Sequence, residues 1–152
     1  MSIALINTAE LTAQLVTLIA EHPEVMAGGF KGIERGEYVN KDAARTPWCG
    51  VYRTQVDYAP KVLGHHSRSW QALLTVKLVV QAHDATGAKA EDACEAAVQQ
   101  VMAAVLSDLT VYTKVDMLKS INIEYSYDET ESKTLDFQWA FITLIYETRS
   151  GV

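Results

Sequence analysis

An alternation of apolar and polar positions is clearest between Trp70 and Ala82. Every even-numbered residue in this range is apolar, whereas the odd-numbered positions mix polar residues such as Lys77 with leucine and valine. Because the side chains of a β-strand point alternately to its two faces, a period of two is typical of a strand with one buried face. The pattern predicts a long strand here, ended by the turn residues from Asp84 to Gly87.

Three further segments carry strand patterns: Trp48–Tyr58, Met117–Tyr127 and Leu135–Tyr146. In the last of them an aromatic series that includes Phe137 and Trp139 occupies odd positions, and apolar residues also fill the even positions from Ala140 to Tyr146. A strand that is apolar on both faces is either central in its sheet or part of a contact between subunits.

Two segments have the spacing of an amphipathic helix. Asn7 followed by Glu10 predicts a helix start, and an apolar stripe then continues until Pro23 ends the helix. The second predicted helix runs from about residue 89 to residue 107. Three acids are expected in its first turns, where the helix dipole favours negative charge: Glu91, Asp92 and Glu95.

Residues 25–47 follow neither period. Glycines at positions 28, 29, 32 and 36 are interleaved with charged residues. Compact domains rarely carry more than about 12–15 residues of structureless loop unless the loop binds something. We therefore expect a long glycine-rich, charged loop over residues 25–47, and we regard it as the first place to look for function.

The order of the predicted elements is α-β-β-α-β-β. It predicts an α+β fold with one mixed or antiparallel sheet of about four main strands and two helices on one face. At 152 residues the chain has the length of a single domain, residues 1–152, which can bury its own core. The other face of the sheet is then left for a partner, which a second copy of the chain would supply.

Composition and charge restrict the partners. The formal net charge is -6 and the isoelectric point is near 5.1, which is the wrong sign for a protein that neutralises nucleic-acid phosphates. No uninterrupted apolar run is long enough for a membrane span, because Lys77 divides the best candidate. The first basic residue is Lys31, so we expect no secretory signal or transit peptide and a protein made in the cytosol.

The charge is unevenly distributed, since the whole negative surplus falls in the second half of the chain. Basic residues dominate from Gly28 to Arg68, and acids crowd a predicted turn near residue 130. We expect these unlike patches, together with the outer apolar face of the last strand, to contact neighbouring subunits or a partner. The candidate interface residues are Lys31, Arg35, Lys41, Arg45, Asp128, Glu129, Glu131, Phe137 and Trp139.

Catalytic and metal-binding patterns are weak. The glycine-rich stretch lacks the spacing of a phosphate-binding loop, and His65 and His66 are adjacent, so they cannot both reach one metal from a regular element. Neither Cys49 nor Cys94 lies in a nucleophile motif, and two buried reduced thiols are expected. The sequence therefore predicts a protein that is not an enzyme, with no cofactor and no metal.

The whole pattern resembles a known family. A capped helix and a glycine-rich stretch precede the Trp48-Cys49-Gly50-Val51-Tyr52 strand and the Trp70-x-x-Leu73-Leu74-x-Val76 strand. A loop with Asp84, the helix start Ala90-Glu91-Asp92-Ala93 and a hairpin from Ile121-x-Ile123-x-Tyr125 to Phe137-x-Trp139-x-Phe141 complete it. This order resembles the tail terminator, or tail completion, proteins of bacteriophages with long, flexible, non-contractile tails.

The resemblance implies a structural virion protein at the head-proximal end of the tail. Such a subunit forms a homo-oligomeric, usually hexameric, ring in the host cytoplasm. The ring caps the completed tube, stops tube polymerisation and joins the tail to the head through a neck protein. Its implied partners are its own copies, the major tube protein and the head-completion protein, while DNA passes through the lumen without sequence-specific binding.

Two alternatives stay open. The chain is also compatible with another ring-forming virion subunit of the tube, baseplate or neck. The second alternative is a non-viral α+β regulatory domain that oligomerises and binds a small ligand in a concave pocket.

Overall fold

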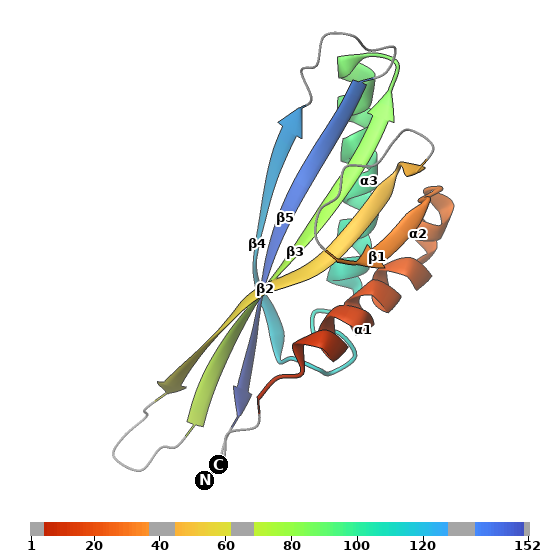
Figure 1. Cartoon of the computed structure of the whole chain (residues 1–152). Helices are drawn as coiled ribbons and strands as arrows, with labels where there is room; N and C mark the ends of the chain where they lie inside the picture. The colour runs from red at the N-terminus through yellow and green to blue at the C-terminus, as the bar shows by residue number, and fades with distance from the viewer. Residues whose placement is uncertain (1–4, 37–44, 62–68, 128–135, 151–152) are drawn as a thin grey trace.

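A computed structural model describes residues 5–36, 45–61, 69–127 and 136–150 (Figure 1). The elements, in chain order, are α1 (Thr8–Glu21), α2 (Pro23–Ala27), β1 (Gly32–Arg35), β2 (Trp48–Lys61), β3 (Ser69–Asp84), α3 (Gly87–Ser107), β4 (Met117–Tyr127) and β5 (Asp136–Ser150). The five strands form one sheet in the order β1-β2-β3-β5-β4.

The fold is α+β with a mixed sheet, as the sequence predicts. β1 runs parallel to β2, and the pairs β2–β3, β3–β5 and β4–β5 are antiparallel. α1 packs on β1 and β2 while α3 packs on β3 and β5, so the helices cover one face of the sheet (Figure 1). The predicted four strands, two helices and order α-β-β-α-β-β are wrong in detail, because α2 and β1 are additional elements between α1 and β2.

The expectation of a structureless loop over residues 25–47 is wrong for the part that the structure describes. Pro23 begins α2, His22 caps it by accepting from the Glu24 amide, and Val25 is buried. The four residues of β1 pair with the start of β2, a partner sixteen positions later in the sequence. Such a short strand depends on its neighbour, so no local period could have shown it.

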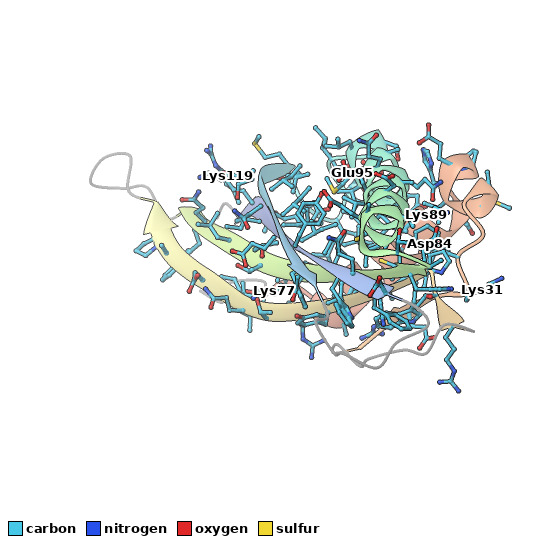
Figure 2. The ribbon with its side chains drawn as sticks, turned by 90° about the horizontal axis from the view of Figure 1, so that it is seen from above. Lys31, Lys77, Asp84, Lys89, Glu95 and Lys119 are labelled. Atoms are coloured by element: carbon cyan, nitrogen blue, oxygen red, sulfur yellow. The ribbon has the colours of Figure 1, made fainter. Side chains whose placement is uncertain are left out.

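The two sheet faces match the alternation in the sequence. Even-numbered residues of β3 and β5, such as Leu78 and Ile142, face the helices and are fully buried with the apolar stripes of α1 and α3. Odd-numbered residues, such as Lys77 and Trp139, lie on the opposite face, which we call the open face. In Figure 2, α3 with Glu95 lies above the sheet and Lys77 below it.

Both long helices begin at side-chain caps. The Asn7 carboxamide oxygen accepts from the Glu10 amide at 3.0 Å, which confirms Asn7 as the helix start, and the Glu10 carboxylate pairs with Lys114. α3 begins at Gly87, capped by Thr86, which is two residues earlier than predicted. The acids at positions 91, 92 and 95 therefore lie beyond the first turn, and the expectation that they serve the helix dipole is wrong.

β2, β3 and β5 are longer than predicted, and their far ends project beyond the helices (Figure 1). The predicted end of this strand at Tyr58 is wrong, since Pro60 lies within β2 and pairs with Trp70. Among the described residues, β2 beyond Val51 pairs with β3 alone, so this part of β2 is an edge where a residue without an N–H is tolerated.

Candidate functional site

The open face carries an aromatic cluster over β2, β3 and β5. Its members are Trp48, Val79 and Trp139, which are buried, and Tyr52, Phe137 and Phe141, which are half-buried. The Phe137 and Trp139 rings stack with centroids 6.2 Å apart. These two residues face away from the helices, as the alternation predicts, but Trp139 is only 6% exposed, so most of its surface is already covered within one chain.

Two glycines allow the Trp48 indole to lie flat against the sheet. A Cβ at Gly50 would come within 2.4 Å of Trp48 Cη2, and one at Gly32 within 3.0 Å of Trp48 Cδ1. The indole Nε1 donates to a Glu34 carboxylate oxygen at 3.3 Å. Gly32 and Gly50, which look like loop or strand-weakening residues in the sequence, thus provide the space for the aromatic cluster.

The basic residues of the glycine-rich stretch lie near the β1 edge of the sheet. Lys31 directly precedes β1, Arg35 ends it, and Arg45 is exposed shortly before β2, whereas Lys41 lies outside the described residues. Figure 2 shows Lys31 and Lys119, which is on β4, at opposite sides of the molecule. The structure therefore brings Lys31 and Arg35 to one flank of the sheet.

Arg35 contributes to a surface hollow that the sequence did not reveal, which we call the two-arginine hollow. It has a volume of about 390 Å³ and is lined by Thr12, Arg35, Gly36, Val51, Tyr52 and Arg53. Within the described part of the chain, neither Arg35 nor Arg53 has an ion-pair partner. Two guanidinium groups with free donors at one hollow favour an anionic partner such as a carboxylate.

A second hollow lies between α3 and the β4 edge, and we call it the three-carboxylate pocket. It has a volume of about 330 Å³ and is lined by Glu91, Asp92, Glu95, Tyr125 and Gln138. The predicted acidic patch of Asp128, Glu129 and Glu131 lies outside the described residues. The pocket was not predicted because its residues come from three elements that only the fold brings together.

Hydrogen bonds organise one side of this pocket. The Tyr125 hydroxyl donates to one carboxylate oxygen of Glu95 at 2.7 Å, and the Gln99 amide donates to the other at 3.0 Å. These bonds lower the pKa of Glu95, with the Tyr125 bond contributing most. Desolvation, followed by the contact with Glu95, raises the pKa of Tyr125 to about 12. The pocket therefore keeps Glu95 charged and Tyr125 neutral at physiological pH.

Gln138 is the most buried of the residues that line the three-carboxylate pocket. Its side chain is 8% exposed, and within the described part of the chain its Oε1 is buried without a hydrogen-bond partner. A buried amide oxygen without a donor costs free energy, so it is a place where a partner's N–H group would be favourable.

The remaining chemical candidates are structural or lie outside the described residues. Cys49 and Cys94 are buried and unpaired, as predicted, and burial raises the pKa of each thiol to about 12. His65 and His66 lie outside the described residues. Among those that the structure describes, no three His, Cys, Asp or Glu side chains gather as a metal site. No described helix is long and apolar enough to cross a membrane.

Comparison with known proteins adds no family. No protein-family model and no curated protein matches this chain. The open face, the two-arginine hollow and the three-carboxylate pocket are therefore the features from which a function has to be inferred.

Proposed function

We propose that this chain is a structural subunit that assembles with its own copies into a ring, and that the ring caps the completed tail tube of a long-tailed bacteriophage. The main observation that supports a ring is that the two edge strands of the described sheet are free to pair with another chain. In the described part of the chain, β1 and β4 each have a neighbouring strand on one side only. Free strand edges are surfaces on which another chain can add.

The two edges are chemically unlike, which favours a ring over a symmetric dimer. The β1 flank carries the two-arginine hollow, and the β4 flank carries the three-carboxylate pocket. A contact between two different surfaces of the same chain is heterologous, and repetition of such a contact closes a ring when the rotation between neighbours allows it.

The assignment to the tail rests on the resemblance to tail terminator proteins. The long elements keep the order α-β-β-α-β-β on which that resemblance depends, with α2 and β1 as short additions. In this role the ring binds the major tube protein on one side and the head-completion protein on the other. The net charge of -6 suits a channel through which DNA passes without being held.

Electron microscopy of negatively stained protein tests this proposal. The purified chain should form rings with six-fold symmetry, and rings added to isolated tail tubes should sit at one tube end. Light scattering after size exclusion should give a mass of several times 16.8 kDa. A monomer that never binds tubes would overturn the proposal, and its thermal stabilisation by a small metabolite would favour the regulatory-domain alternative.

A ring found elsewhere on the virion would indicate that the protein has a different structural role there. Decoration along the whole tube, or at the baseplate end only, would retain ring assembly but contradict the role of a terminator. Joining of capped tails to DNA-filled heads, measured as infectious particles in an assembly extract, should require the ring.

A further inference from the structure

The two-arginine hollow and the three-carboxylate pocket lie at opposite edges of the sheet but on the same side of it. Arg35 is two residues from Ile33, which packs against the core under the helices, and Arg53 pairs in register with the buried Val76. Tyr125 pairs with Ala140, which also faces the helices. Both surfaces therefore open on the helix-bearing side.

The two surfaces are offset by a few residues along the strands. One cross-strand row runs through Arg35, Val51, Leu78, Ile142 and Ile123. Tyr125, in the pocket, is two residues further along β4 than the end of this row, which corresponds to about 7 Å. The row through Arg53 and Val76 ends at Ile121, four residues or about 13 Å from Tyr125. Copies placed side by side thus bring the two surfaces together when they are shifted along the strands by about 7–13 Å.

Each surface has unused hydrogen-bonding groups of the kind that the other supplies. Within the described part of the chain, Glu91 and Asp92 have no ion-pair or hydrogen-bond partner. Gln138 Oε1 is a buried acceptor that receives no hydrogen bond from any described residue. Arg35 and Arg53 offer guanidinium N–H groups, which bind carboxylates in two-point hydrogen bonds and also donate to amide oxygens.

We propose that Arg35 and Arg53 of one copy bind Glu91, Asp92 and Gln138 of the next copy, so that these residues form the repeated contact of the assembly. This inference rests on the proposed function, because it specifies the interface of the proposed ring. Charge complementarity between two flanks of the same chain identifies a second copy as the occupant of both hollows.

Charge reversal tests the contact because it allows a rescue. In the variant R35E/R53E both flanks are acidic, and in the variant E91R/D92R both flanks are basic. Each variant alone should need at least about a hundredfold higher concentration to assemble, because like charges would then face each other. An equimolar mixture should recover rings, since alternating copies again place basic against acidic flanks, and an even-numbered ring closes with both kinds.

Controls separate this contact from a folding defect or a general charge effect. Neither pair touches the core, so each variant should keep the thermal midpoint of the native chain in its monomeric form. The matched control E21R/E24R changes by the same charge two exposed acids that line neither hollow, and it should assemble like the native chain. Raising the salt concentration should weaken native rings through screening of the same charges.

The outcomes distinguish this contact from the proposed function. If the native chain forms rings and both double variants also form them unchanged, the proposed contact is wrong, but the proposed ring assembly is still supported. If the native chain forms no ring at all, the proposed function fails first. If inorganic phosphate stabilises the native chain but not R35E/R53E, and assembly is unaffected by the substitutions, the hollow is an anion site and the contact is overturned.

Discussion

The two faces of the sheet are buried by different means. On the helix-covered face, aliphatic side chains such as Leu78 and Ile142 are sealed by α1 and α3 and are fully inaccessible. On the open face, Trp48 and Trp139 are covered mainly because flat rings lie against the strands and against each other. Burial on the helix-covered face needs a layer of helices over the sheet, whereas burial on the open face needs glycines and stacked rings. Stability is therefore expected to depend far more on the helix-covered face.

Adjacent residues of β3 give the sharpest test of this difference. Leu78→Ala should lower the free energy of unfolding by about 2–5 kcal/mol, because it removes methyl groups and leaves a cavity under α3. Lys77→Ala, one position away on the open face, should change it by less than about 0.5 kcal/mol. Urea denaturation of both variants measures the contrast, and equal losses would show that the two faces do not differ as described.

The glycine beneath the Trp48 indole tests how the open face is built. Gly50→Ala should destabilise the protein by about 1–3 kcal/mol, because the new methyl group would push the ring off the sheet. Trp48→Leu in the same chain should recover part of this loss, since the clashing ring is then absent. A double-mutant cycle in urea measures the coupling, and strictly additive effects would show that the ring and the glycine do not depend on each other.

A paired carboxylate gives the open face a dependence on pH. Glu147 is 5% exposed and accepts from Arg149 Nε at 3.0 Å, with Lys119 Nζ at 3.4 Å from its other oxygen. The Arg149 bond, helped by Lys119, lowers the pKa of Glu147. Its stabilising contribution should be complete above the pKa of an unfolded glutamate, about 4.3, and should fall as the pH drops towards the lower folded value.

The matched variant for this effect is Glu147→Gln, which cannot titrate. The difference in unfolding free energy between native and variant chains should be constant near neutral pH and should shrink below about pH 4.3. Denaturation curves from pH 7 down to pH 3 measure it. A difference that grows on acidification would contradict the assigned direction of the shift.

The smallest effect is expected at Tyr125 and Glu95 of the three-carboxylate pocket, which are both exposed. Tyr125→Phe should change stability by less than about 0.5 kcal/mol, because the lost bond to Glu95 lies at the surface. It should nevertheless raise the pKa of Glu95 towards its ordinary value, since that bond is the main cause of the shift. Titration followed by NMR measures this, and an unmoved pKa would remove Tyr125 from the organisation of the pocket.

Long periodic elements were predictable from the sequence and short dependent ones were not. The alternation around Leu78 correctly predicted β3 and the faces of its residues, and Asn7 and Pro23 correctly predicted the limits of α1. β1 was missed because four residues are too few for a period and because its partner strand lies later in the chain. The ends of β2, β3 and β5 were underestimated, since pairing continues where the apolar pattern fades, whereas the predicted limits of β4 are confirmed.

The sequence predicted the sign of the charge at the candidate interface, but not which of the charged residues share a surface. The basic surplus between Gly28 and Arg68 predicted a cationic surface, and Arg35 lies at such a surface. Arg35 and Arg53 line the same hollow because β1 pairs in parallel with β2, which places Arg35 beside Val51, two residues before Arg53. The interface roles of Lys31, Arg45, Phe137 and Trp139 stay predictions, and those of Lys41, Asp128, Glu129 and Glu131 concern positions outside the described residues.

The sequence by itself determined which residues form the long strands and helices and which of their faces are apolar, because those properties depend on periods of two and of about 3.6 residues. Only the tertiary structure decided which charged groups share a surface. Glu91, Tyr125 and Gln138 come from α3, β4 and β5, and they meet because β5 lies between β3 and β4 while α3 crosses above. Such contacts depend on strand order and helix placement, which no local pattern specifies.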